Sequence, residues 1–250
     1  MNLVPFKIDS STFVTDIVTH DYRAADVFLK YDIDFCCGGK WPLDIVCESK
    51  GLETESIINE LNLKLRHSSD GIVMEFDEWD LNFLADYILN IHHRYLHKAL
   101  PETNQYVNRF LAGHQKKFPE LAELGKIMEK MMKEIPPHMK KEEEIIFPYI
   151  KQIFHAWQHK ESYASLLIRT LRKPVEEVMQ NEHESVGKQL HLIREITNNY
   201  TLPEKPCVTH RVTFSKLKEL DINLVQHIHL ENNILFPKAI ALEKVLLFQE

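Results

Sequence analysis

The segments His138-Met-Lys-Lys-Glu142-Glu-Glu-Ile-Ile-Phe-Pro148 and His227-Ile-His-Leu-Glu231-Asn-Asn-Ile-Leu-Phe-Pro237 are two copies of one pattern, HxxxExxIxFP. An α-helix turns once in about 3.6 residues, so a His and a Glu four positions apart project from the same face. Both side chains end in atoms that bind metal ions. A single HxxxE also fits an exposed helical charge pair, but two copies that share five identities predict a metal clamp on each of two helices.

The repeat extends upstream of both motifs. His93 lies 45 residues before His138, and His183 lies 44 residues before His227, so each unit is a histidine followed, one helical hairpin later, by HxxxE. Two helical hairpins pack as a four-helix bundle, and ligands on facing helices of such a bundle form dinuclear carboxylate sites. The sequence therefore predicts an all-α fold in which four histidines and two glutamates converge. These six candidate ligands are His93, His138, Glu142, His183, His227 and Glu231.

The choice of the first ligand depends on helical register. His92, His93 and His97 all lie in the first predicted bundle helix, which begins at Asp77 or Asp80. His93 and His97 share a face, whereas His92 is rotated by about 100° from His93. The repeat favours His93 as the ligand, and His97 is the alternative. The predicted buried stripe of this helix is Leu81, Leu84, Ile88, Ile91, Tyr95 and Leu96.

Several polar residues near the motifs are expected to lie outside the site. His229 is rotated by about 200° from His227 and points elsewhere. A solvated helix face is predicted for Lys140, Lys141, Glu143 and Glu144. Upstream, Pro136 and Pro137 remove two helical hydrogen-bond donors, so we expect a kink or break there, with a new helical segment starting at His138.

Composition limits the classes of function. The chain has 250 residues, of which 44% are hydrophobic and 27% charged, and its net charge of −7 comes with interspersed signs. These values are typical of a globular protein and offer no basic surface for nucleic acid. No stretch approaches about 18 consecutive apolar residues, and the N-terminus lacks a secretory pattern. We therefore expect a cytoplasmic protein that does not associate with membranes.

Two domains are predicted. Residues 1–68 read as a small helical domain with helices over 13–19 and 21–31, a third from Pro42, and a fourth over 53–65, and residues 77–250 form the bundle. The core of the first domain is small and marginal by itself, so it needs docking or pairing, which leaves a homodimer open. In the bundle, helices are expected after Pro119, from Pro174 and around Phe214, the last one after a loop over 201–213.

The first domain carries the segment Tyr31-Asp-Ile-Asp-Phe-Cys36-Cys37-Gly38-Gly39-Lys40. The glycines allow another molecule to approach closely, and the following helix N-terminus and Lys40 favour thiolates. The alternative is that one cysteine is buried and the glycines merely end a helix. The spacing of the four cysteines fits neither a zinc finger nor a disulfide framework, and Cys47 and Cys207 are interpreted as structural.

Ligand type indicates the metal. Four imidazoles and two carboxylates suit iron or manganese better than calcium or magnesium, and exceed what one tetrahedral zinc needs. Two metal ions are therefore expected. If Glu142 and Glu231 bridge them, each ion has two imidazoles and carboxylate oxygens, and a bridging oxo or hydroxo group leaves room for a small ligand such as dioxygen or nitric oxide.

These segments resemble the di-iron, hemerythrin-like family for repair of iron centres, whose members join a Cys-Cys-Gly-Gly domain to a hemerythrin-like bundle. The resemblance covers essentially the whole chain and rests on residues 31–40, both HxxxExxIxFP segments and Glu182-His183-Glu184. It implies that the four histidines are terminal ligands of two irons that Glu142 and Glu231 bridge. It also implies that Cys36 and Cys37 match the family's paired cysteines.

The resemblance further implies a stress-response protein that restores iron–sulfur clusters damaged by nitric oxide or peroxide. In this hypothesis a labile di-iron site releases iron, and Cys36 and Cys37 relay it or contact the damaged iron–sulfur protein. Two alternatives stay open: an enzyme that reduces nitric oxide at the two irons, and a binder or sensor of dioxygen or nitric oxide. The paired cysteines argue against the last, because oxygen binding does not require them.

Overall fold

The computed structural model of the chain describes residues 6–36, 39–66, 74–114, 116–171 and 175–248. In these ranges the regular structure is helical, and the only β-type pairing is an isolated bridge between Phe13 and Pro42, which confirms the predicted all-α class. Contacts divide the chain into two compact units, Met1–Asp80 with Ile228–Pro237, and Leu81–His227 with Lys238–Glu250. Within the same ranges, no helix combines the length and apolar character needed to cross a bilayer.

The first unit contains four short helices, which lie within a few residues of the predicted positions. They are α1 (Val14–His20), α2 (Ala24–Lys30), α3 (Leu43–Ser49) and α4 (Thr54–Arg66). Pro42 directly precedes α3, where its missing N–H leaves no helical hydrogen bond unmade. The fully buried side chains Phe28, Phe35 and Leu61 give this unit its core.

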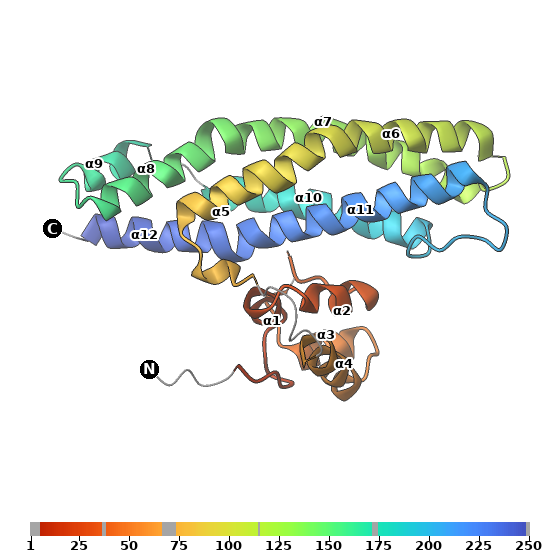
Figure 1. The fold of residues 1–250 in the computed structure, drawn as a ribbon, viewed down its shortest axis with the longest axis horizontal. Coiled ribbons are helices and arrows are strands. Elements are labelled where there is room, and N and C mark those ends of the chain that lie inside the picture. Colours follow the sequence, from red (N-terminus) through yellow and green to blue (C-terminus); the bar gives the residue numbers. More distant parts are fainter. Residues whose placement is uncertain (1–5, 37–38, 67–73, 115, 172–174, 249–250) are drawn as a thin grey trace. The chain divides into compact units, whose positions relative to one another are not determined.

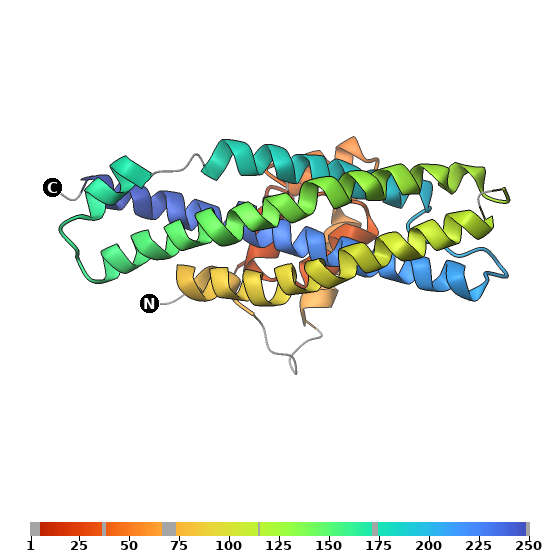
Figure 2. The ribbon, with the colours of Figure 1, turned by 90° about the horizontal axis from the view of Figure 1, so that it is seen from above.

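Four long helical runs form the bundle, and they lie alongside one another in Figures 1 and 2. Shorter elements accompany them, namely η3 (Pro119–Ala122) and α9 (Ala164–Leu171), whereas η1 (Phe76–Glu78) belongs to the first unit. The helix α7 packs against both α6 and α10. The four runs are α5 (Leu81–Tyr87), η2 (Ile88–His93) and α6 (Arg94–His114); α7 (Glu123–Lys141), η4 (Glu142–Ile146) and α8 (Phe147–Gln158); α10 (Val175–Ile196); and α11 (Val208–Leu230), η5 (Glu231–Leu235) and α12 (Phe236–Phe248).

Three of these runs contain a π-helical turn, η2, η4 or η5. The last two begin at the glutamates of the HxxxE motifs and are each followed by the Phe-Pro pair of the repeat. Pro148 and Pro237 cannot donate a backbone hydrogen bond, and the proline ring clashes with the carbonyl four residues earlier, at Glu144 and Asn233. Because those carbonyls lie inside the π turns, the wider turn relieves the clash.

The predicted break at Pro136 and Pro137 is wrong. Helix α7 runs through both prolines to Lys141. The carbonyls that lose their partners are those of Met132 and Lys133, four residues earlier, and Lys133 and Pro137 both lie on the exposed face. Water can hydrogen-bond the carbonyl of Lys133 there, which lowers the cost of the interruption, and the helix continues.

Two further predictions about the bundle are wrong. Ile91 was placed in the buried stripe, but its side chain is 49% exposed. It lies in the π turn η2, whose extra residue shifts the phase of the helix. The last long helix begins at Val208, so the predicted loop over 201–213 is too long, and Cys207 directly precedes the helix.

Candidate metal centre

The structure brings all six candidate ligands together from the four helical runs. His93 ends η2, His138 and Glu142 lie at the junction of α7 and η4, His183 lies in α10, and the pair from the second motif lies where α11 meets η5. All six side chains are buried, and both glutamates have no exposed surface. The HxxxE spacing therefore does place each His and its Glu on one face, as helical geometry requires.

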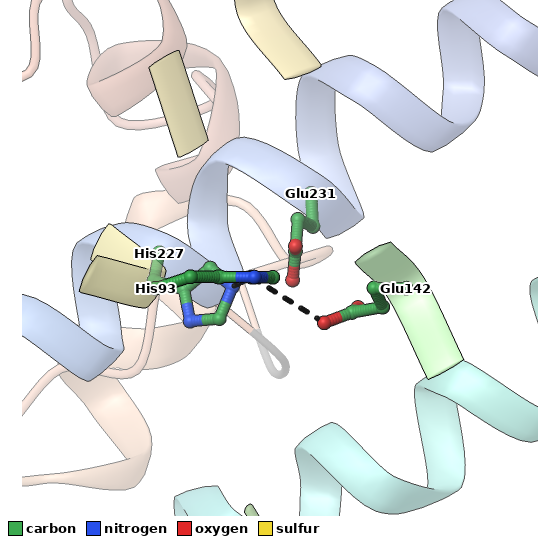
Figure 3. A group of neighbouring side chains, drawn as sticks. All are labelled: His93, Glu142, His227 and Glu231. Carbon is green, nitrogen blue, oxygen red and sulfur yellow. Dashed lines mark hydrogen bonds and ion pairs between the residues drawn. The ribbon is translucent and has the colours of Figure 1, made fainter. Parts of the chain in front are cut away.

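The six residues form two groups of four that share both glutamates. One group is His93, Glu142, His227 and Glu231, and the other is His138, Glu142, His183 and Glu231. Within each group, one ligand atom from every residue lies within 4.8 Å of the others. Figure 3 shows the first group, with both imidazoles and both carboxylates directed toward one point. Each group offers two imidazole nitrogens and two carboxylate oxygens.

The carboxylate of Glu142 faces both groups. Its Oε2 lies 3.5 Å from Nε2 of His93. Its Oε1 lies 3.2 Å from Nε2 of His138 and 3.8 Å from Nε2 of His183. One oxygen of the same carboxylate is thus directed to each pair of histidines, which is the arrangement a bridging carboxylate needs.

The imidazoles present the same nitrogen to the site. Nε2 of His93 lies 3.1 Å from Nε2 of His227, and Nε2 of His138 lies 2.9 Å from Nε2 of His183. Nitrogens that converge so closely can bind one ion in common. The donor set of imidazole nitrogen and carboxylate oxygen, buried in the bundle, fits two transition-metal ions better than calcium or magnesium.

Two carboxylates accept hydrogen bonds from the Nδ1 atoms of candidate ligand histidines, on the side of each ring that faces away from the site. Nδ1–H of His93 donates to Oε1 of Glu143 at 2.9 Å, and Nδ1–H of His138 donates to Oε2 of Glu182 at 2.6 Å. Such hydrogen bonds fix the ring orientation and the tautomer, which leaves Nε2 available to a metal. Burial raises the pKa of Glu182, but the hydrogen bond and charge of His138, together with Lys141, outweigh it and lower the pKa below its usual value.

The interpretation of Glu143 as a solvated surface residue is therefore wrong. It follows Glu142 directly, and the side chain is 27% exposed because it packs against His93 and also accepts a hydrogen bond from Nε2 of His97 at 3.2 Å. His97, the alternative first ligand, is half-exposed and belongs to neither group. The sequence signal that could have identified Glu143 is its place one residue after a ligand, where an acidic side chain can reach a histidine of the facing helix.

Two other histidines lie near the groups without joining them. His92 is buried, and its ring stacks on that of His227 with centroids 5.8 Å apart. His229 is also buried, with its ring centroid 5.6 Å from that of Phe35 in an edge-to-face arrangement, and Nδ2–H of Asn233 donates to its Nδ1 at 2.9 Å. Burial lowers the pKa of His229 to about 4. Both histidines are therefore core residues.

Cys36 lies in the first unit and is buried. Its backbone N–H donates to Oδ1 of Asp34 at 2.9 Å, and its carbonyl accepts a hydrogen bond from Asn232 at 3.2 Å. Cys37 and the adjacent Gly38 lie outside the described residues. At Gly39, an added Cβ would lie 2.8 Å from Cγ2 of Thr15 and 2.9 Å from Cα of Phe35. The chain passes too close to its neighbours there for any side chain, so this glycine does more than end a helix.

Comparisons with known proteins match both parts of the chain. A family model described as the hemerythrin HHE cation binding domain covers residues 84–239, and a model described as a domain of unknown function, DUF542, covers residues 10–64. Proteins named iron–sulfur cluster repair protein YtfE, from Citrobacter koseri and from the O8 and K12 strains of Escherichia coli, are each 33% identical to the chain over 219 residues. The matched region is 88% of this chain and 92% of each relative.

Proposed function

The chain belongs to the hemerythrin-type family of iron–sulfur cluster repair proteins, and from this membership we propose that it repairs clusters damaged by nitrosative or oxidative stress, with two iron ions held at the buried histidine–glutamate site. The observation that carries the proposal is the pair of four-donor groups that share Glu142 and Glu231. A site built this way holds two ions side by side instead of one. Two bound irons would supply redox chemistry, and they are also the element from which a damaged cluster is rebuilt.

The residues of the site have different roles. The four Nε2 atoms form the ends of the site, and the two shared carboxylates lie between them. Glu143 and Glu182 hold the Nδ1 protons of His93 and His138, so these rings stay in one orientation whether or not iron is present. We propose that the ligand set persists while iron, as cargo, leaves and returns.

Cys36 and Cys37 are proposed to act outside the metal site, as the thiols that relay iron or contact the damaged protein. Gly39, which follows the two cysteines closely in the chain, is held against the rest of the first unit, because it has no space for a side chain and its carbonyl accepts the backbone N–H of Thr15 at 3.1 Å. A thiol is also the group that binds iron in iron–sulfur proteins. In this scheme the two cysteines are required for the transfer of iron and dispensable for its storage.

The test measures metal content and repair on the same preparations. Wild-type protein purified without added metal should contain about two irons per chain and should restore activity to a nitric oxide-treated [4Fe–4S] enzyme. A Glu142→Gln/Glu231→Gln variant should lose both iron and repair, whereas Cys36→Ser/Cys37→Ser should keep the iron and lose repair. The matched control is Cys47→Ser, which removes a buried thiol elsewhere in the first unit.

Each component of the proposal can fail separately. One zinc per chain, or no metal, would reject the di-iron site. Full iron content without any repair by the wild-type protein would reject the repair activity for this chain. Unchanged repair by the double cysteine variant would reject the relay role while leaving the metal site intact.

A further inference from the structure

A second group of reactive side chains lies in the bundle, away from the histidine–glutamate site. It consists of Cys207, His114 and His210, hereafter the Cys207 cluster. Cys207 directly precedes α11, and its carbonyl accepts the N–H of Arg211 at 3.1 Å, the first hydrogen bond of that helix. Its Sγ accepts the backbone N–H of His210 at 3.3 Å. The sulfur therefore occupies the capping position at the positive end of a 23-residue helix, where a negative charge is stabilised.

His114 is positioned to take the proton of this thiol. Its Nε2 lies 3.1 Å from Sγ of Cys207, and its Nδ1 lies 3.0 Å from the carbonyl oxygen of Phe110. A carbonyl only accepts hydrogen bonds, so the proton of the neutral ring is on Nδ1 and Nε2 presents a lone pair to the thiol. The ring also stacks on Phe110, with centroids 4.8 Å apart and planes 15° from parallel. The thiol of Cys207, the base His114 and the Phe110 carbonyl that orients this base are thus linked one to the next through hydrogen-bond contacts.

His210 forms the buried side of the cluster. It is 3% exposed, its ring lies 6.4 Å from that of His114, and its Nε2 has no hydrogen-bond partner among the described residues. Rings of Phe110, Phe118 and Phe214 surround it. Burial is the main cause that lowers the pKa of His210, and the charges of His114 and Lys117 lower it further. A neutral His210 leaves His114 as the proton acceptor.

The cluster is open to solvent on its other side, because Cys207 is exposed. Lys116 and Lys117 follow His114 closely in the chain, and Lys205 lies two residues before Cys207 with Glu204 beside it, so positive charges outnumber negative ones in these segments. These charges favour an anionic reaction partner. A structural cap would not need these features, since Ser, Thr, Asp or Asn serve better as caps than Cys. A metal ion is also a poorer explanation, because the cluster is not among the sets of three or more described ligands within binding distance of one another.

We propose that Cys207 is a nucleophilic thiol that undergoes thiol–disulfide exchange with small anionic disulfides, with His114 as its base. Cys207 transfers its proton to Nε2 of His114, and the resulting thiolate attacks one sulfur of the disulfide. A new S–S bond forms to Cys207 as the S–S bond of the reagent breaks, and the leaving thiolate takes the proton from His114. The sulfur of Cys207 is oxidised and one half of the reagent is reduced to a thiol, so protons and electrons balance. The protein then carries a mixed disulfide at the start of α11.

The test uses full-length protein and 5,5′-dithiobis(2-nitrobenzoate), a dianionic disulfide whose released thiolate is coloured. Peptide mass mapping at successive times assigns the reaction to each cysteine separately. At pH 7, Cys207 should react roughly tenfold faster in the folded wild-type protein than in the same chain unfolded in urea. The His114→Asn variant keeps a donor for the Phe110 carbonyl and removes the base, and it should react roughly tenfold more slowly than wild type. His159→Asn, an exposed histidine of the same unit, is the matched control and should react as wild type does.

A second reagent tests the charge preference. Cystamine, a dicationic disulfide, should modify Cys207 more slowly than the dianion, and added salt should narrow the difference because it screens the lysines. Equal rates for folded and unfolded wild-type chain would overturn the proposal even if His114→Asn failed to fold. Wild-type rates in a folded His114→Asn variant would overturn the role of the histidine.

Discussion

At the level of single residues, the hydrogen bonds behind His93 and His138 predict a measurable effect on metal affinity. Glu143→Gln and Glu182→Gln replace a carboxylate acceptor by a neutral amide of the same shape. We expect each to weaken metal binding by about 10- to 100-fold, because the ring it orients loses basicity and a fixed tautomer. Competition with a chromogenic chelator measures the affinity. Thermal unfolding of the metal-free variants should stay close to wild type.

Glu144→Gln is the matched control for that prediction. Glu144 is adjacent in sequence, but its side chain is 64% exposed and its ion pair is with Lys140, at 3.9 Å. It should leave metal affinity unchanged. An equal loss of affinity in Glu144→Gln would show that the effect is one of general charge near the site.

His210 predicts a pH dependence of stability. Its pKa in the folded protein lies below the ordinary value of 6.5, chiefly because the ring is buried. The unfolded chain therefore binds a proton more readily, and the free energy of unfolding should fall as the pH drops below about 6.5 toward the lowered value. His210→Phe removes this group and should show a shallower fall between pH 7 and pH 5. Urea unfolding at a series of pH values measures the free energy of unfolding of wild type and of His210→Phe. An equal dependence on pH in the two proteins would contradict the prediction.

The grouping of the candidate ligands could be predicted from the sequence, because their spacing follows the fixed periodicity of a helix. His138 with Glu142 and His227 with Glu231 need only one turn of helix to come together. The partners behind them could not be predicted in this way, because the contact between Glu143 and His93 joins residues 50 positions apart and depends on how two helices rotate against each other. The position of Cys207 directly before a helix could not be predicted for another reason, namely that the start of α11 was placed too late.

At the level of elements, the π turns predict where the chain tolerates a deletion. A π turn holds one more residue than an α turn, so removing Glu144 from η4 should let this turn become α-helical while the flanking residues keep their faces. Removing Glu129 from α7 instead rotates all later core residues by about 100°. We expect the first deletion to keep helical content and a cooperative unfolding transition at reduced stability, because the α-helical turn restores the clash of Pro148, and to weaken metal binding at Glu142. The second should lose cooperative unfolding, as circular dichroism will show.

Replacing a proline inside α7 should increase the stability of the protein. Pro137 lies inside the helix on its exposed face, and it leaves the carbonyl of Lys133 without a helical donor. Pro137→Ala restores that donor and should raise the free energy of unfolding by about 1 to 3 kcal/mol. Pro119→Ala is the control, because Pro119 begins η3, where a donor is not needed, and it should give no gain. Chemical denaturation measures the free energy of unfolding of both variants. An equal change in Pro137→Ala and Pro119→Ala would contradict the prediction.

Helix positions were largely predictable because capping residues and apolar periodicity are local signals. The errors at Pro136, Pro137 and Ile91 have a common cause. The rules for prolines and for periodicity both assume an ideal α-helix without its surroundings. On the exposed face, water reduces the cost of a proline, and in η2 the π turn shifts the positions that the periodicity predicts to be buried. The Phe-Pro pair after each HxxxE was a visible signal for two of the three π turns, but η2 has no such proline within or directly after it.

At the level of the whole molecule, the candidate metal site joins four helical runs, and this predicts how stability depends on metal. Glu142 and Glu231 are fully buried, and burying carboxylates is costly without a compensating positive charge. Metal-loaded protein should therefore unfold at a higher temperature than protein stripped by a chelator, with a stabilisation of roughly 3 kcal/mol at metal concentrations about 100-fold above the dissociation constant.

The same cost predicts the behaviour of the Glu142→Gln/Glu231→Gln variant. Neutral amides lose the metal but are cheaper to bury, so the variant should unfold at a temperature above that of stripped wild type and below that of loaded wild type. Adding metal should not change the unfolding temperature of this variant. Scanning calorimetry of all three forms gives the order directly. If stripped wild type were the most stable form, the buried carboxylates would have to be stabilised by the protein alone, and the site would be a structural hydrogen-bond network and not a place built for a removable metal.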